Sequence, residues 1–540
     1  MILTAEMLRE GTRCHRIGDY LFLPDFDPFV QNLDRLVRQV ARRGCYPARL
    51  RELGQAARHS RHARFDLWAR IKEEYKHGCY GERMGWRQRY ESGDRVPKTD
   101  PRWLRGAPRE LISYLQWEAG TDSAYGDAFG LYPSCPHTGL RYMVHDDGIV
   151  VQTLKAFNLF RLGRIRQLGA LEDPLVMRSG GKRRAYRYDH SRYIHSLDVG
   201  AIGSVMMSNM AGGLTTEERL HCLVAMLMHD GRIPAHGDGT KLLNPLAFDE
   251  DANIRELFKS PGWPALKERW GLSEEMLVAV VQETLPPLNL IKDLSDKIGY
   301  TARDVDGVII HTPEELRRCG EKEQPDHATI RRLLKRYPFI CDMWDSFRLR
   351  EGKVYSTDAE RLHDFLLLRT LMHRGLYFNP DARFREFVVS KVIVQYLYNS
   401  GRVTRDWLLT VGDAELDHLV EAVIDRPGGI DDLSHMGTPH VEVFRTIEEA
   451  ELRARTLREG GTEFVFVEHL TRRLKPGVQL LVQKPSGRIL PFCEAHPAEA
   501  QRLERLARVR HPARVYYLTE PDVSEEFRQA YKSYVARYSA

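Results

Sequence analysis

An apolar run from Leu220 to Met228 ends in the dipeptide His229-Asp230. The run follows Thr215–Glu218, which has the spacing of a helix-capping box, and its apolar residues recur at helical intervals. The segment therefore predicts a buried helix that carries an imidazole and a carboxylate at its C-terminal end. A second helix is expected to begin near His195 and to turn its apolar residues inward, namely Leu197, Ile202, Val205 and Met206.

Two other phrases supply side chains of the same kinds. His195 ends the phrase Tyr188–His195, and Asp296 opens the phrase Asp296–Asp304. Two imidazoles and two carboxylates are a ligand set that divalent cations accept, and such an ion can bind a phosphate oxygen and lower the pKa of water. The alternative is that His229 caps a helix C-terminus, where positive charge is favoured, and that the others are surface polar residues.

Length and composition exclude several classes of protein. A chain of 540 residues is long enough for two to four domains, and no stretch approaches the roughly 18 apolar residues of a membrane span. The N-terminus lacks the features of a secretory signal, and the eight cysteines include no close pair, so we expect a cytoplasmic protein without disulfides. The net charge of +5 is compatible with anionic ligands without demanding nucleic acid.

The residue pattern of the sequence changes twice along the chain. Residues 1–145 form an N-terminal extension of unassigned function, 146–425 are mainly helical in pattern, and 426–540 predict a smaller α+β region. Arg426–Asp432 is typical of a linker. The elements expected beyond it are strands near 464–467, 478–482, 489–490 and 514–518, and helices near 446–458 and 497–508.

Four phrases resemble, in the same order, the deoxynucleoside triphosphate (dNTP) triphosphohydrolases of the HD-domain phosphohydrolase superfamily. They are Phe160–Gly169, resembling the opening helix, His190–Leu197, Asp296–Asp304 and Arg369–Tyr377, and they span about half of the chain, residues 146–385. The resemblance implies a mainly α fold with an HD-domain helical core, and assembly into a homo-oligomer. It also implies one divalent metal ion, with manganese, magnesium, iron and zinc left open.

The resemblance assigns a role to each matched residue. The metal ligands would be His195, His229, Asp230 and Asp296. Gln167 and Leu168 would lie beside the sugar, and the phosphates would be bound by Arg192, Lys297 and Arg369. The sugar and base pocket would be shaped by Tyr300, Asp304, His373 and Tyr377.

The spacing of these residues agrees with the roles. Asp296, Tyr300 and Asp304 are four apart, as are Arg369, His373 and Tyr377, so each triple shares one helix face if the segments are helical. Guanidinium groups suit a triphosphate. The alternative for each triple is ordinary helix packing with surface salt bridges, and Arg192 is then a surface arginine in a basic loop.

The segment after Asp230 departs from the family pattern, because Gly231–Gly239 is about two residues shorter. His236 is the best match for the catalytic histidine and Asp238 for the carboxylate that orients it, while Arg232 stands where a further histidine is usual. Glu250 replaces a histidine of the catalytic relay. The alternative is that His236 is a loop residue and that the site has changed or lost its chemistry.

The expected reaction is metal-assisted hydrolysis at the α-phosphate of a dNTP, in which His236 protonates the departing nucleoside oxygen and inorganic triphosphate is released. Two alternatives stay open. The same site could serve a nucleotidase, a phosphodiesterase or a single-strand nuclease, whose nucleic acid would follow the arginine-rich stretch Arg161–Arg192. The protein could also be a nucleotide-binding sensor without turnover.

Overall fold

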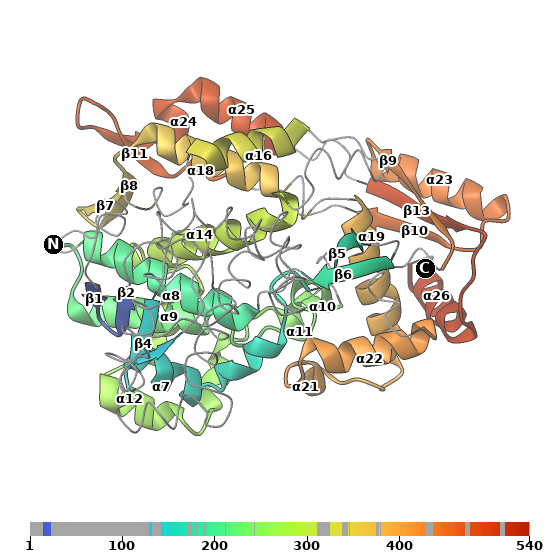
Figure 1. Ribbon diagram of the computed structural model, residues 1–540, viewed down its shortest axis with the longest axis horizontal. Helices are drawn as coiled ribbons and strands as arrows, with labels where there is room; N and C mark the ends of the chain where they lie inside the picture. Colours follow the sequence, from blue (N-terminus) through green and yellow to red (C-terminus); the bar gives the residue numbers. More distant parts are fainter. Residues whose placement is uncertain are drawn as a thin grey trace, which may run out of the picture.

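The computed structural model of the chain (Figure 1) describes a helical body with several small sheets. The residues that it describes are 15–22, 129–131, 142–145, 147–169, 174–179, 182–187, 191–210, 212–241, 243–309, 325–336, 344, 346–373, 377, 380–426, 436–469, 476–507 and 513–538. Most of the predicted N-terminal extension, and nearly all of the linker predicted at Arg426–Asp432, lie outside them. The predicted fold class, mainly α with a smaller content of strands, is confirmed.

Helices from the middle of the sequence form the larger apolar core, which we call the first core. They are α7 (Ile149–Ala156), α8 (Arg192–Asn209), α9 (Thr216–Met228), α13 (Glu274–Val281), α14 (Leu288–Ile309) and α18 (Ala359–Met372). The predicted capping box of α9 is present at Thr215 and Glu218, and the helix ends at His229 as expected. On α8, all four residues expected to face inward are buried.

The segment before α8 differs from the expected helix. Leu159–Arg164 is a short 3-10 helix (η2), after which Arg166 forms an isolated β-bridge with Ser191. The phrase Phe160–Gly169 is therefore helical only in its first half, and its second half runs beside the start of α8. A sheet of four short strands is linked to α8, because Tyr142 of its last strand donates a hydrogen bond to Asp198. The strands are β1 (His15–Ile17), β2 (Tyr20–Phe22), β3 (Phe129–Leu131) and β4 (Tyr142–His145).

A second core lies beside the first and combines helices with an antiparallel sheet. Its helical segments are α19 (Pro380–Phe387), the π-helix η6 (Val388–Val394), α20 (Gln395–Asn399), α21 (Arg405–Leu408), α22 (Asp413–Ile424) and α26 (Glu525–Tyr538). Its sheet has the order β10 (Val465–His469), β13 (Ala513–Thr519), β9 (Thr438–Phe444), and α23 (Ile447–Glu459) packs on it. Figure 1 shows this unit on the right.

Residues 476–507 leave the second core and return to the first. Strand β11 (Leu481–Gln483) pairs in parallel with β8 (Lys353–Ser356), and the resulting sheet has the order β12-β11-β8-β7, with β12 at Ile489–Pro491 and β7 at Phe347–Arg350. Helices α24 (Phe492–Ala495) and α25 (Pro497–Ala507) follow and pack near α18 (Figure 1). The strands and helices predicted beyond residue 446 are thus found, but they divide between two cores.

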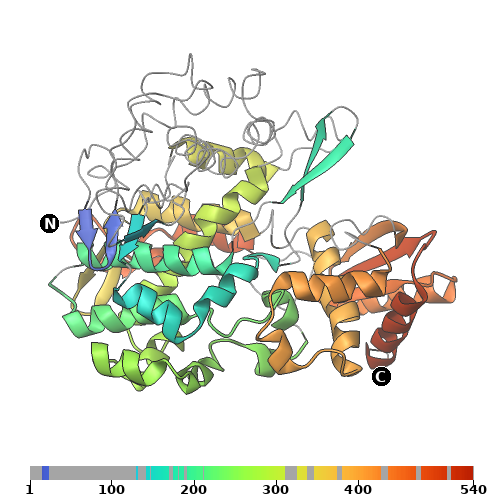
Figure 2. The ribbon, with the colours of Figure 1, turned by 60° about the horizontal axis from the view of Figure 1, so that its bottom comes forward.

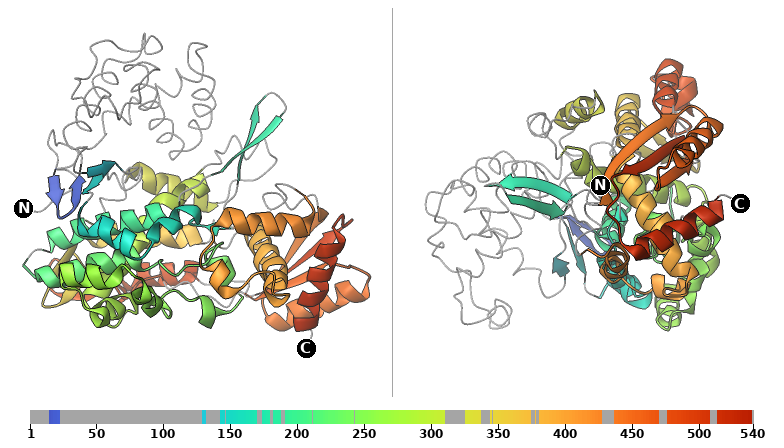
Figure 3. Two further views of the ribbon diagram at one scale, coloured as in Figure 1. Left: turned by 90° about the horizontal axis from the view of Figure 1, so that it is seen from below. Right: turned by 90° about the vertical axis from the view of Figure 1, so that its right-hand side faces the viewer.

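The remaining elements surround the first core. They are α10 (Asp238–Lys241), α11 (Pro245–Phe248), η4 (Ile254–Lys259), α12 (Trp263–Trp270) and α16 (Pro325–Arg336). The hairpin of β5 (Pro174–Ser179) and β6 (Lys182–Arg187) extends away from the helices (Figures 2 and 3). Within the part of the chain that the structure describes, no helix is both long and apolar enough to cross a membrane.

Candidate metal centre and substrate pocket

The four predicted metal ligands meet at the junction of three helices. Nε2 of His195 on α8 lies 2.9 Å from Oδ1 of Asp296 on α14. Nε2 of His229, at the end of α9, lies 3.7 Å from Oδ1 of Asp230 and 3.8 Å from Oδ1 of Asp296. Ligand atoms about 2 Å from one ion lie roughly 3 to 4 Å apart, so this donor set fits a divalent metal. Ligand atoms of His195, His229 and Asp230 all lie within 4.8 Å of one another.

Local contacts prepare His229 to bind a metal. Its Nδ1 lies 2.7 Å from the carbonyl oxygen of Met226. A carbonyl only accepts hydrogen bonds, so Nδ1 carries the proton and Nε2 presents its lone pair to the carboxylates. Burial lowers the pKa of His229, which favours the neutral ring that metals require.

The two carboxylates of the centre are ionised. Burial acts to raise the pKa of Asp230, but the charge of Arg192 and the nearby imidazoles hold it at about 2. The pKa of Asp296 is also lowered, because the contact with His195 and the surrounding positive charges outweigh burial. One buried and one partly buried negative charge therefore face two imidazoles, an arrangement that a divalent cation would stabilise.

Arg192 connects the centre to the shortened loop. The arginine is buried and donates from Nη1 to Asp230 and from Nη2 to Asp238, each across 3.0 Å. Lys241 extends the network, since Nζ lies 2.9 Å from Asp238 and also binds Glu250. Burial raises the pKa of Glu250 to about 7, against the charge of Lys241. Glu250 thus lies in a charged chain that leads to the metal centre, and a phosphate-binding role for Arg192 stays a prediction.

The carboxylate that contacts His236 is not the expected one. Nε2 of His236 lies 2.7 Å from Oδ1 of Asp417 on α22, whereas Asp238 is engaged by Arg192 and Lys241. The prediction that Asp238 orients His236 is therefore wrong, because the shorter loop turns Asp238 toward the basic side chains. Arg232, which stands in place of a histidine, forms an ion pair with Glu256 instead.

Side chains of the two triples are in contact, although α18 ends at Met372 and Tyr377 lies beyond it. Arg369 donates from Nε to the phenolic oxygen of Tyr300 across 2.5 Å, and Tyr377 donates its hydroxyl to Asp304. The rings of His373 and Tyr377 meet edge to face with centroids 4.7 Å apart. The end of α18 and the face of α14 that carries Asp296 thus form one surface.

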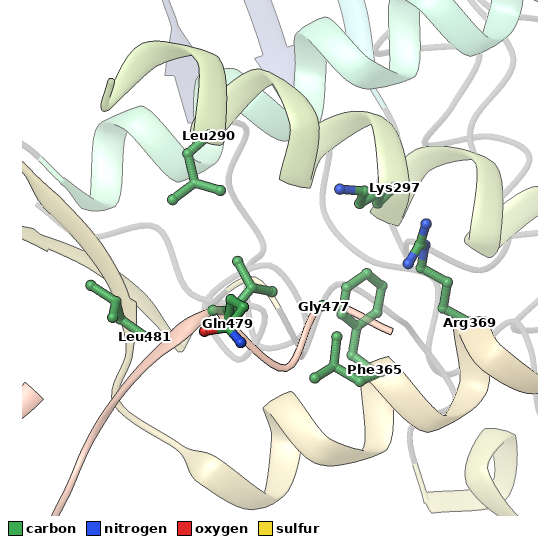
Figure 4. Close-up of a pocket in the computed structure, with 9 residues that line it drawn as sticks. Leu290, Lys297, Phe365, Arg369, Gly477, Gln479 and Leu481 are labelled. Carbon is green, nitrogen blue, oxygen red and sulfur yellow. The ribbon is translucent and has the colours of Figure 1, made fainter. Parts of the chain in front are cut away.

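A pocket of about 240 Å³ lies between α14, α18 and the returning C-terminal segment (Figure 4). Lys297 and Arg369 line one end of it, as Figure 4 shows, and Nζ of Lys297 is paired with Asp293. The other end is mostly apolar, and the remaining lining residues are Leu290, Phe365, Leu366, Gly477, Gln479, Leu480 and Leu481. Lys297 directly follows the metal-ligand candidate Asp296 on α14, and Arg369 of this end of the pocket donates to Tyr300 of the same helix.

Gln167 and Leu168 lie beside the first turn of α8, because the N–H of Arg192 donates to the carbonyl of Ile165 across 2.9 Å. Gln167 is buried, and its Oε1 has no hydrogen-bond partner among the described residues. An orphaned buried acceptor of this kind fits a residue that waits for a ligand. The contact of Gln167 with a sugar stays a prediction.

Four contributors to the site were not predicted from the sequence. Asp413 and Asp417 come from α22, about 180 residues after His236, and Lys241 follows the loop. The wall formed by Gly477–Leu481 comes from a segment that was assigned to another region. The i,i+4 spacing of the two aspartates on a capped helix was the one available signal.

No family model and no curated protein matches the chain. Among solved structures, the chain is similar to a hypothetical protein from Aquifex aeolicus, at 18% identity over 76% of this chain and 100% of that chain, with a TM-score of 0.49. It is also similar to a phosphohydrolase from Bacteroides thetaiotaomicron, at 13% identity over 70% of this chain and 98% of that chain, with a TM-score of 0.48.

Proposed function

We propose that the protein is a metal-dependent phosphohydrolase that cleaves dNTPs into a deoxynucleoside and inorganic triphosphate. The observation that carries the proposal is the convergence of His195, His229 and Asp230, with Asp296 beside both imidazoles. A divalent ion bound by these residues would supply Lewis acidity toward a phosphoryl oxygen and toward water.

The surrounding residues support a nucleotide as the substrate. Lys297 and Arg369 supply two basic side chains at one end of the pocket, where we expect a polyphosphate to bind. Tyr300, His373 and Tyr377 offer ring faces and edges for a sugar and base. His236 would donate the proton that the departing nucleoside oxygen needs.

A dNTP panel with product identification tests the proposal. Purified protein is incubated with each dNTP and with manganese, magnesium, iron or zinc, and the products are separated by anion-exchange chromatography. We expect deoxynucleoside and triphosphate in at least one combination, no turnover by Asp296→Asn, and normal turnover by His418→Gln, which alters an exposed histidine on α22. Monophosphate with pyrophosphate would contradict the reaction, and nucleotide binding without turnover in any metal would favour a sensor.

A further inference from the structure

Helix α22 of the second core holds both the backbone and the ring of His236. The residue has a left-handed backbone, with φ of 59°, and it is buried. Its N–H donates to Oδ1 of Asp413 across 2.7 Å, and its Nε2 lies 2.7 Å from Oδ1 of Asp417. Two aspartates one helical turn apart therefore fix the one histidine of the shortened loop.

Arg166 holds the two aspartates in turn. Its Nη2 lies 3.0 Å from both carboxylate oxygens of Asp417, and its Nε lies 3.0 Å from Oδ2 of Asp413. The three side chains are largely buried, so the hydrogen bonds are shielded from water. A substitution at Asp417 leaves the contact between Arg166 and Asp413 in place. The orientation of His236 can therefore be tested without removing the contact that docks α22.

The docking of α22 is close and leaves little freedom. A Cβ at Gly412 would come 2.5 Å from Cβ of Arg164, and a Cβ at Gly169 would come 2.6 Å from the carbonyl oxygen of His236. Arg164 also forms a 2.7 Å ion pair with Glu415. The segment 164–169, the loop at His236 and the start of α22 are thus packed at backbone distance.

The ring nitrogens of His236 have different surroundings. An ionised carboxylate only accepts hydrogen bonds, so Nε2 carries a proton toward Asp417. Nδ1 is buried and has no hydrogen-bond partner within the ranges that the structure describes. Of the two ring nitrogens, only Nδ1 thus lacks a hydrogen-bond partner among the described residues.

We propose that Asp417 is the positioning residue of His236, which fixes the Nε2–H form of the ring so that Nδ1 exchanges the proton with the substrate. The proposal rests on the proposed function in taking His236 as the proton donor. The step requires a proton on Nδ1 as well as on Nε2. Water forms a bond to the α-phosphorus and loses a proton to solvent, the bond from phosphorus to the nucleoside oxygen breaks, and that oxygen takes the Nδ1 proton. His236 is left neutral, with its Nε2–H still on Asp417.

Nitrogen-15 NMR of histidine-labelled protein tests the contact without any need for activity. The His236 signals are assigned by their loss in His236→Gln. We expect the Nε2 and Nδ1 signals to move in Asp417→Asn, because the charged acceptor is lost, and to stay unchanged in Asp238→Asn and in His418→Gln. Unchanged His236 signals in Asp417→Asn would overturn the proposal.

Steady-state kinetics with the dNTP that is turned over tests the consequence. We expect Asp417→Asn to lower kcat by about 100-fold with KM within about twofold, and Asp417→Glu to recover part of the loss. A larger effect on KM than on kcat, or no recovery by Asp417→Glu, would assign Asp417 to folding alone. If the wild-type protein hydrolyses no dNTP, the proposed function fails, and the NMR comparison still decides whether Asp417 positions His236.

Discussion

Nη1 of Arg192 lies 3.0 Å from Oδ2 of Asp230, and this buried ion pair forms one wall of the candidate metal centre. The pair leaves Oδ1 of Asp230 directed to His229, 3.7 Å from its Nε2. One carboxylate thus serves two functions, because one oxygen neutralises the arginine and the other is available to a metal. The ion pair therefore links the geometry of the metal centre to the stability of the surrounding fold.

Arg192→Gln is expected to destabilise the protein by about 3 kcal/mol, because it leaves the carboxylate of Asp230 buried without its partner. Chemical denaturation measures the loss. The control is Arg255→Gln, which removes the exposed ion pair with Glu274 and should cost less than about 0.5 kcal/mol. Equal losses in the two variants would show that the buried pair contributes no more than a surface pair.

The wild-type protein is expected to bind one divalent metal ion per chain, and His229→Gln is expected to lose most of it. The reason is that Nε2 of His229 lies between two carboxylates, and a glutamine cannot present an imidazole lone pair there. Elemental analysis after dialysis gives the metal content, with His418→Gln as the histidine control. If His229→Gln bound as much metal as the wild-type protein, His229 would be excluded as a metal ligand.

Glu250 predicts a pH dependence of stability. Its pKa is raised by burial to about 7 from an ordinary value of 4.5, so in this window the folded protein holds a proton that the unfolded chain has released. The free energy of unfolding contributed by Glu250 therefore decreases as pH rises from about 4.5 to 7.

Glu250→Gln should remove this dependence. The difference in unfolding free energy between wild type and Glu250→Gln should change by on the order of 2 kcal/mol between about pH 5 and pH 8. Unfolding curves at several pH values measure it. Glu268→Gln, on the exposed face of α12, should show the same pH dependence of the unfolding free energy as the wild type. The same pH dependence in Glu250→Gln as in the wild type would contradict the expectation.

Gly169→Ala is expected to lower turnover as well as stability. Gly169 has a φ of 53°, and an added Cβ would meet the carbonyl oxygen of His236 at 2.6 Å, so the histidine must shift. Gly271→Ala is the matched control, since Gly271 has a φ of 62° but nothing within 4 Å of its Cβ position. Both variants carry the backbone cost of about 1 kcal/mol, and only Gly169→Ala should lower kcat in a dNTPase assay. Equal kcat values would show that His236 tolerates displacement.

Leu290→Trp is expected to weaken dNTP binding, because the larger side chain fills the apolar end of the 240 Å³ pocket. A rise in KM of about tenfold, equivalent to about 1.4 kcal/mol, is the expected size. Leu246→Trp, at a surface position that is 86% exposed, should leave KM unchanged. An unchanged KM in Leu290→Trp would place the substrate elsewhere.

The parts of the site that sequence reasoning anticipated depend on local periodicity. The capping box at Thr215 and the apolar spacing of α9 predict where His229 lies, because both are properties of one helix. The i,i+4 spacing of Tyr300 and Asp304 likewise predicts that they share one face of α14, where Tyr300 contacts Arg369 and Asp304 contacts Tyr377. Within a helix, spacing along the chain translates directly into a shared face.

The parts that were missed depend on contacts between distant segments. The orientation of His236 is set by Asp417, and no local pattern connects a loop with a helix so far along the chain. Asp238 was the best match to the family pattern, but the backbone is left-handed at His236 and Gly237, and Asp238 pairs with Lys241 instead. Similarly, the residue pattern beyond residue 446 predicted the strands and helices there, but it did not indicate which of the two cores each of them joins.

The return of residues 476–507 to the first core has a consequence for synthesis of the protein. Strand β11 pairs with β8, and Gly477–Leu481 closes the pocket beside Lys297. A nascent chain on the ribosome therefore contains all four candidate metal ligands by residue 296, long before the segment that completes the pocket is synthesised. Premature stop products that end before this point would retain the histidines and aspartates of the centre but lack the wall opposite Lys297.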